Sequence, residues 1–216
     1  MWPNLERSFI MTDKKAHIVN VAIELFAQNG FEGTSMRDLS NAAGVNIAMI
    51  NYYFGTKEKL FETIVESRSN MFRERLEEIY NNKKLSYLQK IEKYIDFQVE
   101  KILEKRHFHK VIHSEVMLNK RPELNAAIGN IFKRNMTTIK TIIEEGCKSG
   151  EFKKVDAGLV VASIHGTVNT VFLSSTMCKL ILTVDENTDP FSSPKIKKKV
   201  SDYLKQLMRA YLLKNE

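Results

Sequence analysis

The stretch that most constrains this chain runs from residue 34 to residue 57 and reads TSMRDLSNAAGVNIAMINYYFGTK. Its apolar residues recur at helical spacing, and two N-cap residue types precede them, which predicts a short helix with one buried face. Gly44 follows, where a left-handed helix end favours glycine. Asn46 can cap a second short helix, and Gly55-Thr56 ends it and caps a third. Two helices joined by a short turn containing glycine form a helix-turn-helix, whose second helix can enter a DNA major groove.

The residue set in this region resembles the N-terminal DNA-binding domain of the TetR/AcrR family of transcription regulators. The resemblance extends without a gap from about Lys14 to Val65 and includes AQNGFEGTSMRDLSNAAGV and YYFGTKEKLF. It covers the apolar, glycine, tyrosine and lysine positions together, so it is more specific than helical spacing alone. The resemblance implies an all-α fold, in which a three-helix DNA-binding domain precedes a larger helical domain for ligand binding and dimerisation.

We expect the chain to have three parts. Residues 1–10 form a flexible N-terminal extension, residues 11–56 the DNA-binding domain, and residues 57–216 the helical effector-binding and dimerisation domain. The first ten residues show neither helical period nor caps, and Met11 resembles a second start of the chain. Met11 is therefore an alternative biological start.

Helical periodicity extends through the rest of the chain. The first helix is expected from about Asp13 to Asn29, with Phe31 folding back into the core, and a long helix from about Lys57 to Asn81 leads out of the DNA-binding domain. At 1.5 Å per residue such a helix reaches roughly 37 Å, enough to carry a shift between domains. Further helices are expected over about 86–105, 107–118, 122–148 and 194–213, and over an almost wholly apolar segment, 157–182.

Composition excludes several other classes of protein. No apolar run reaches the roughly 18 residues that a membrane span requires, and the opening MWPNLERSFI lacks the order of a secretory signal. Cys147 and Cys178 form no disulfide scaffold, so we expect a reducing, cytoplasmic location. The net charge of +7 is no argument for DNA binding, because residues 1–60 hold six Lys or Arg against six Asp or Glu.

The resemblance assigns the candidate DNA contacts. Tyr52, Tyr53 and Lys57 match positions that bind phosphates, which accept hydrogen bonds from hydroxyl and ammonium groups. Arg37 matches a position that reaches a base edge, with a surface ion pair to Asp38 or Asp13 as the alternative. Asn51 stands where the family usually has tyrosine, which removes one phosphate contact and offers an adenine reader, so its role stays open.

Five further residues complete the DNA-contact set. Thr34 and Ser35 would bind phosphates from the preceding helix, with helix capping alone as the alternative for Thr34. Asn46, Ile47 and Ala48 face outward on the recognition helix, where Ile47 and Ala48 can meet a thymine methyl only by apolar contact.

The resemblance also places an effector pocket in the C-terminal helices. The pocket candidates are aromatic, methionine and polar residues, a set that suits an apolar or amphipathic small molecule. They are Tyr94, Phe97, Phe108, Met117, Phe132, Met136, His165, Asn169 and Phe172. The last two helices are too apolar for the edge of a monomer, and in the family the corresponding pair forms a four-helix bundle with its two-fold mate. Burial within one subunit is the alternative.

The sequence therefore predicts a ligand-responsive DNA-binding repressor, a homodimer that an effector releases from two-fold operator DNA. An effector-independent DNA-organising protein is the alternative. We expect no cofactor and no catalysis, because neither a nucleophile with a base nor paired carboxylates form a recognisable motif. His107, His109 and His113 include an i, i+4 pair, but no further ligand lies at a recognised spacing apart from Glu115, so we expect helix surface there and no metal.

Overall fold

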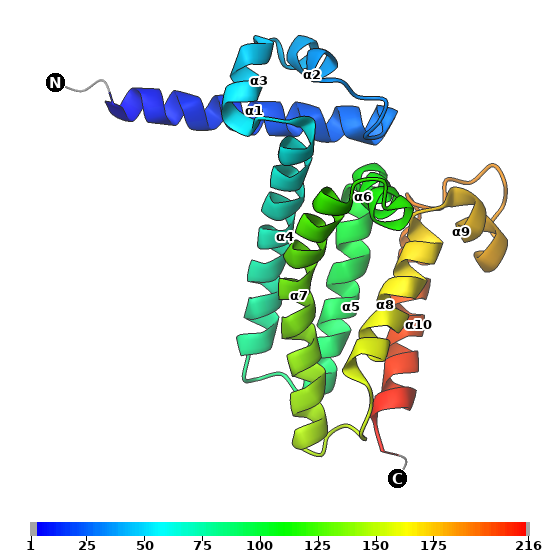
Figure 1. Ribbon diagram of the computed structural model, residues 1–216. Coiled ribbons are helices and arrows are strands. Elements are labelled where there is room, and N and C mark those ends of the chain that lie inside the picture. Colours follow the sequence, from blue (N-terminus) through cyan, green and yellow to red (C-terminus); the bar gives the residue numbers. More distant parts are fainter. Residues whose placement is uncertain (1–3, 215–216) are drawn as a thin grey trace. The chain divides into compact units, whose positions relative to one another are not determined.

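The computed structural model describes the backbone of residues 4–214 and the side chains of residues 14–214. Over this range the chain is helical, and its β-type pairing is one isolated antiparallel bridge between Phe152 and Leu213. The expected all-α fold is confirmed (Figure 1). The helices are α1 (Asn4–Asn29), α2 (Met36–Ala43), α3 (Ile47–Phe54), α4 (Lys57–Asn81), α5 (Tyr87–Glu104), α6 (Arg106–Leu118), α7 (Pro122–Lys148), α8 (Ala157–Phe172), α9 (Ser175–Leu182) and α10 (Pro194–Leu212).

The chain forms two compact units, and each is discontinuous in sequence. The N-terminal unit comprises residues 1–68 and 107–131, and the C-terminal unit comprises residues 69–106 and 132–216. This division differs from the expected boundary at residue 57, because the first part of α4, nearly all of α6 and the start of α7 group with the helix-turn-helix. Helices α4 and α7 therefore contribute to both units.

Aromatic rings form the centre of the N-terminal unit. Phe31 stacks on Phe26 at a centroid distance of 5.6 Å, and Phe61 meets both rings edge-on at 5.2 Å. Phe108 of α6 lies 5.5 Å from Phe61, which explains why α6 belongs to this unit. Aromatic pairs at such distances add about 0.5–1.5 kcal/mol each beyond the area that they bury. Helices α1, α2 and α3 pack in succession around this core (Figure 1).

Helix α1 begins earlier than the sequence pattern predicted. It starts at Asn4 instead of near Asp13, and no glycine or proline interrupts residues 4–13 to end it. Residues 1–3 of the expected flexible extension lie outside the described residues.

The C-terminal unit is a helical bundle in which α5 packs against α8 and α10 (Figure 1). Its buried side chains are mostly aliphatic, with the rings of Tyr94, Phe152 and Phe172 among them. These include Ile91, Ile95, Val99, Ile139, Ile142, Ile143, Val160, Val161, Ile164, Val168, Val200, Leu204 and Met208.

The expected single helix over residues 157–182 is two helices, so this expectation was wrong. Helix α8 ends at Phe172, and α9 follows after a bend of 102°. The Ser174 hydroxyl accepts a hydrogen bond from the Met177 N–H at 3.2 Å and so caps the start of α9. A serine side chain that bonds the backbone in this way offers an alternative to continuing the helix, which the apolar pattern alone does not reveal.

Within the described range, no single helix is long and apolar enough to cross a membrane. The bent pair α8 and α9 meets the length and composition of a broken span. Seven side chains of α8 are buried inside the C-terminal unit: Ala157, Val160, Val161, Ile164, Val168, Val171 and Phe172.

The close packing of the Phe152 ring against Gly146 of α7 can be tested by substitution. A Cβ atom at Gly146 would lie 2.3 and 2.4 Å from ring carbons of Phe152, and that ring is only 1% exposed and cannot move aside. We expect Gly146→Ala to lower the free energy of unfolding by about 1–3 kcal/mol. Gly129→Ala in the same helix meets no atom within 4 Å and should raise it by about 0.5–1 kcal/mol. Urea unfolding of both variants measures the difference, and equal effects would contradict the packing.

Candidate functional site

Local hydrogen bonds fix the helix-turn-helix. Ser35 and Asp38 form a capping box, in which the Asp38 N–H donates to the Ser35 hydroxyl at 3.1 Å and the Ser35 N–H to the Asp38 carboxylate at 2.9 Å. The hydrogen bonds from Ser35 lower the pKa of Asp38. Gly44 ends α2 with φ of 62°, and the Asn46 side chain accepts from the Ala48 N–H at 2.8 Å to start α3. These expected caps are confirmed, and they set the direction in which α3 leaves the turn.

The outer face of α3 is open to solvent. Asn46, Ala48 and Asn51 are exposed, and Ile47 and Tyr52 are 40% and 75% exposed. A short helix that carries amides, small apolar groups and a tyrosine on one free face has the chemistry to enter a major groove. Tyr53 is partly buried, and its ring meets that of Tyr52 edge-on at 5.5 Å.

Arg37 is exposed and forms no ion pair within the described residues. Of the two alternative partners, Asp38 is bonded to Ser35, and the side chain of Asp13 lies outside the described part of the chain. The guanidinium is therefore available for a base edge or a phosphate.

The structure favours the alternative, structural role for the Thr34 side chain, and contact between Thr34 and DNA stays a prediction. Thr34 is fully buried, and its hydroxyl donates to the Gly30 carbonyl at 2.8 Å. It satisfies a carbonyl at the end of α1, whereas Ser35 caps α2. Adjacent Thr and Ser of similar capping propensity take opposite roles because only one of them can have the extended N-cap geometry.

Lys57 has a structural role that the sequence did not reveal. Its ammonium group donates to the carbonyls of Phe31 and Thr34, each at 2.9 Å, and lies 4.4 Å from the centroid of the Phe31 ring. Two of the three N–H donors are used in this way, which leaves one for a phosphate. Contact between Lys57 and DNA stays a prediction.

Arg121, in the loop before α7, was also missed. Its guanidinium lies 4.3 Å from the centroid of the Phe31 ring and pairs with Glu115 at 2.6 Å, with Glu58 at 3.9 Å and with Glu32. The hydrogen bond from Arg121 lowers the pKa of Glu32. No motif marks an arginine before a proline as a packing centre, because its partners lie as many as 89 residues away.

The C-terminal unit brings two pocket candidates together and adds a lysine. Tyr94, buried in α5, is hydrogen-bonded to the Nε2 atom of His165 in α8. Burial raises the pKa of Tyr94, whereas burial and the nearby charge of Lys101 lower the pKa of His165 to about 4. Both side chains are therefore neutral at pH 7. Burial also lowers the pKa of Lys101 to about 8.

The remaining pocket candidates divide between the units. Phe97, Phe132, Met136 and Asn169 are partly buried in the C-terminal unit, and Phe172 is fully buried there. Phe108 and Met117 belong to the N-terminal unit, where Phe108 packs on Phe61 and Met117 is 71% exposed. Their shared role in one pocket stays a prediction.

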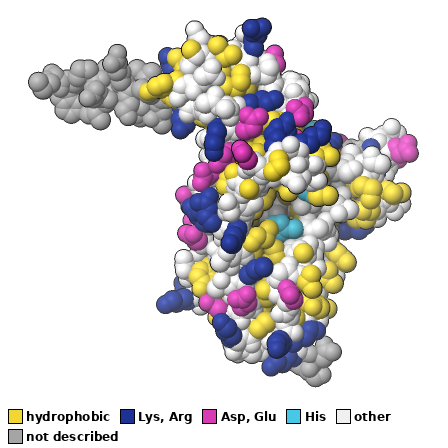
Figure 2. Space-filling model, viewed as in Figure 1, with side chains coloured by type: hydrophobic (Ala, Val, Ile, Leu, Met, Phe, Trp, Pro, Cys, Tyr) yellow, Lys and Arg dark blue, Asp and Glu magenta, His cyan; other side chains and the backbone are white. Residues whose placement is uncertain are grey.

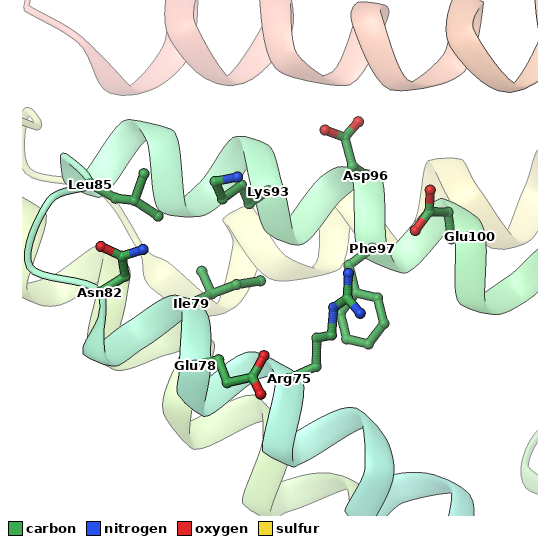
Figure 3. Close-up of a pocket in the computed structure, with 9 residues that line it drawn as sticks. All are labelled: Arg75, Glu78, Ile79, Asn82, Leu85, Lys93, Asp96, Phe97 and Glu100. Carbon is green, nitrogen blue, oxygen red and sulfur yellow. The ribbon is translucent and has the colours of Figure 1, made fainter.

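A pocket of about 560 Å³ opens between α4 and α5 in the C-terminal unit (Figure 3). Of the pocket candidates, Phe97 lines it, with the Arg75 guanidinium 5.3 Å from the ring centroid. Its other lining residues are Glu78, Ile79, Asn82, Leu85, Lys93, Asp96 and Glu100. Lys205 and Lys197 of α10 pair with Asp96 at 2.7 Å and Glu100 at 3.1 Å, so two of its acidic groups are already neutralised.

The C-terminal unit exposes apolar side chains on α8, α9 and α10. On α10, Tyr203, Leu207 and Tyr211 are 54%, 36% and 45% exposed, and Leu159 of α8 is 66% exposed. Apolar side chains also lie at the surface of α9 (Figure 2), where they are Met177, Leu180 and Ile181. The apolar faces of α8 and α10 are therefore only partly covered within one subunit.

Among the described residues, no group of three or more His, Cys, Asp or Glu side chains could hold a metal ion. His113 is exposed on α6, and Cys147 and Cys178 are free thiols.

Comparison with known proteins identifies relatives of both parts of the chain. The family model described as "Bacterial regulatory proteins, tetR family" matches residues 18–64, and that described as "YsiA-like protein, C-terminal region" matches residues 65–191. The chain is 27% identical over 157 residues to the fatty acid metabolism regulator protein of Bacillus subtilis, covering 72% of this chain and 80% of the relative. It is 30% identical over 142 residues to the probable HTH-type transcriptional regulator YttP of the same organism, covering 64% and 67%.

Solved structures share the fold. The transcriptional regulator FadR from Bacillus subtilis, in complex with stearoyl-CoA, superposes with a TM-score of 0.71 at 23% identity and covers 88% of this chain and 96% of its own. The fatty acid degradation regulator FadR from Bacillus halodurans gives 0.72 at 19% identity, with coverage of 91% and 96%.

His165 generates a prediction on pH. Its pKa of about 4 in the folded protein lies below the unfolded value of about 6.5, so the unfolded state binds more protons between these values. This contribution to stability is therefore present above pH 6.5 and is lost as the pH falls towards 4. We expect the free energy of unfolding to fall by about 2 kcal/mol more between pH 7 and pH 5 than in His165→Gln. Urea unfolding at both pH values measures this, and exposed His113→Gln, the control, should behave as the unmodified protein does.

Proposed function

The chain belongs to the TetR family of bacterial transcriptional regulators and is a ligand-responsive DNA-binding repressor. We propose that it binds two-fold operator DNA as a homodimer and that a long-chain acyl compound releases it from that DNA. The observation that best supports DNA binding is the solvent-exposed face of α3. Gly44 and the helix caps at Ser35 and Asn46 hold this helix in place. We also propose that the protein catalyses no reaction and lies in the cytoplasm.

Within this face, different residues serve different parts of the duplex. Tyr52 is an exposed hydroxyl donor at the edge of the motif and suits a phosphate. The exposed Ser35 hydroxyl already donates to the Asp38 carboxylate, so it must exchange that bond to reach a phosphate. Arg37 and Asn51 are exposed polar groups and suit base edges, arginine for guanine and asparagine for adenine.

The proposed dimer uses α8 and α10. The exposed apolar side chains of Leu159, Tyr203, Leu207 and Tyr211 are an observation that favours pairing of this surface with a second copy. A two-fold dimer places two recognition helices on half-sites about one duplex turn, roughly 34 Å, apart. One helix-turn-helix alone would read too few base pairs to be selective.

The effector class follows from two lines of support. Two of the relatives carry fatty acid metabolism or degradation in their names, and one was solved with stearoyl-CoA. The C-terminal unit has a large apolar core of aliphatic and aromatic side chains with the neutral Tyr94–His165 pair inside it. An apolar interior with a few polar groups suits a ligand that has a long hydrocarbon tail and a polar end.

Coupling between effector and operator requires that each ligand prefer a different conformation. Helices α4 and α7 both contribute residues to both units, so a shift of either helix affects each of them. A 100-fold loss of operator affinity needs about 2.7 kcal/mol of difference in effector affinity between the two conformations.

Arg37 and Asn51 allow the DNA-binding half to be tested. If either side chain reads a base, its alanine variant should relax the preference at one symmetric position in each half-site, at a cost of about 1–3 kcal/mol there. The measurement is operator selection from random duplexes followed by titration of single-base variants. Lys154→Ala, which removes an exposed cation from the C-terminal unit, is the charge-matched control for Arg37. Uniform weakening over all sequences would make the residue a backbone contact.

The release mechanism predicts reciprocity. By thermodynamic linkage, stearoyl-CoA or stearate must weaken operator binding by the same factor by which the operator weakens binding of that acyl compound. Titration of each compound into free protein and into the protein–operator complex measures both factors. If neither compound binds more weakly to the complex, the switch is refuted, and the effector-independent DNA-binding protein becomes the better interpretation.

A further inference from the structure

Lys101 in the C-terminal unit has the shortest ammonium-to-ring distance of the described lysines that lie over aromatic rings. Its ammonium group is 3.8 Å from the centroid of the Phe72 ring. Among the described residues it has neither an acidic partner nor a hydrogen-bond acceptor. Lys57 and Lys90 also lie over rings, at 4.4 and 5.2 Å, but each also donates to a backbone carbonyl, at 2.9 and 2.7 Å. Lys101 therefore has unused N–H donors in an apolar setting.

The groups around this ammonium contribute no negative charge. His165 lies close enough for its own pKa to be lowered by Lys101, and Tyr94 is bonded to His165 with its phenol protonated. Tyr94, Gln98 and Lys101 follow at i, i+4 and i+7, so they share one face of α5. The Oε1 atom of Gln98 is buried and has no hydrogen-bond partner in the structure. A half-buried, uncompensated cation thus lies beside unsatisfied and neutral polar groups.

Such a cluster is costly unless something binds to it. Desolvating an ammonium group costs more free energy than a cation–π contact returns. A carboxylate would supply the missing charge and accept hydrogen bonds from Lys101 and from the Gln98 amide after rotation of its side chain.

The cluster adjoins the pocket between α4 and α5. Phe97 lines that pocket and stacks on Phe72 at a centroid distance of 4.8 Å, and Phe72 carries the Lys101 ammonium on its ring. Figure 3 shows the Phe97 ring beside Arg75 at the wall of this pocket. The stacked rings of Phe97 and Phe72 therefore connect the lining of the open pocket with the Lys101 ammonium.

One cation in apolar surroundings favours a monoanion. A phosphate-bearing head group would bring two or more charges and would leave most of them desolvated and unpaired. A carboxylate brings one charge, and the neighbouring aliphatic and aromatic side chains suit a hydrocarbon tail.

We propose that Lys101, with Tyr94, Gln98 and His165 beside it, binds the carboxylate of a free long-chain carboxylic acid inside the C-terminal unit. This inference rests on the proposed function, since it names the head group of the acyl effector.

The experiment compares stearate, methyl stearate and stearoyl-CoA by calorimetric titration of the full chain. Methyl stearate has the same tail without the charge. Lys101→Met keeps the length of the side chain and removes the ammonium group. Lys93→Met is the matched control, because Lys93 is an exposed lysine on the same helix and lines the open pocket. A thermal melt of each variant verifies folding, and removing a desolvated charge should not lower the melting temperature of Lys101→Met.

We expect stearate to bind the unmodified protein and Lys93→Met equally and to bind Lys101→Met about 10- to 100-fold more weakly. Methyl stearate should bind the unmodified protein and Lys101→Met alike, and more weakly than stearate binds the unmodified protein. Equal stearate affinity for the unmodified protein and Lys101→Met would overturn the proposal, as would a loss confined to Lys93→Met.

Operator release separates this proposal from the proposed function. If stearoyl-CoA releases operator DNA and stearate does not bind, the carboxylate subsite is wrong and acyl-responsive repression stands. If stearate binds through Lys101 and operator affinity does not change, the subsite is right and the release mechanism fails. If no acyl compound binds, both proposals fail.

Discussion

The helix-turn-helix depends on the position of one ring, that of Phe31. The ring stacks on Phe26 and meets Phe61 edge-on, and the ammonium of Lys57 and the guanidinium of Arg121 lie 4.4 and 4.3 Å from its centroid. Its backbone carbonyl accepts from Lys57, as does that of Thr34, just before α2. The loop that leads from α1 into α2 is therefore held through both its side chain and its backbone. Since Ser35 begins α2 directly after this loop, the position at which α2 starts follows from it.

The same ring links segments that are distant in sequence. Arg121 lies in the loop between α6 and α7, yet its partners Glu32 and Glu58 belong to the DNA-binding region. Glu115 of α6 pairs with the same guanidinium, and the Glu115 side chain is only 9% exposed. Removing one partner of such a network leaves a poorly solvated charge, which costs more than an exposed pair contributes. Residues 107–131 are thus held within the N-terminal unit by electrostatics as well as by Phe108, and a displacement of α6 would disturb the surroundings of Phe31 directly.

Much of the fold was predictable because the controlling interactions are local. The capping box at Ser35, the left-handed Gly44 and the Asn46 cap involve residues within three positions of one another, so their spacing in the sequence is sufficient evidence. The roles of Lys57 and Arg121 were not predictable, because each is decided by acceptors or rings brought close by folding, up to 89 residues away for Arg121. The acceptor of Thr34 is local, four residues away, but Thr34 and the adjacent Ser35 are both N-cap residue types, so the sequence does not decide between them. The break between α8 and α9 was missed although its cause is local. It has a local cause in Ser174, but an apolar run on both sides concealed it. For the candidate site, residue type alone proposed Tyr94 and His165, which the structure brings together, whereas nothing in the sequence distinguishes Lys101 from the other lysines.

The role of a lysine that lies over an aromatic ring depends on whether its ammonium group also has a hydrogen-bond acceptor. Lys57 and Lys90 have the same aromatic contact as Lys101, and both complete it with a carbonyl acceptor. With its charge satisfied, a lysine of this kind fixes a loop and contributes to stability. Without an acceptor the same group is a net cost to the folded state, since an apolar side chain of similar length would fill the space without a desolvated charge. A helical unit whose only task was to dimerise would gain by that replacement. An unpaired ammonium beside a neutral Tyr94–His165 pair therefore points to a ligand that supplies the missing negative charge.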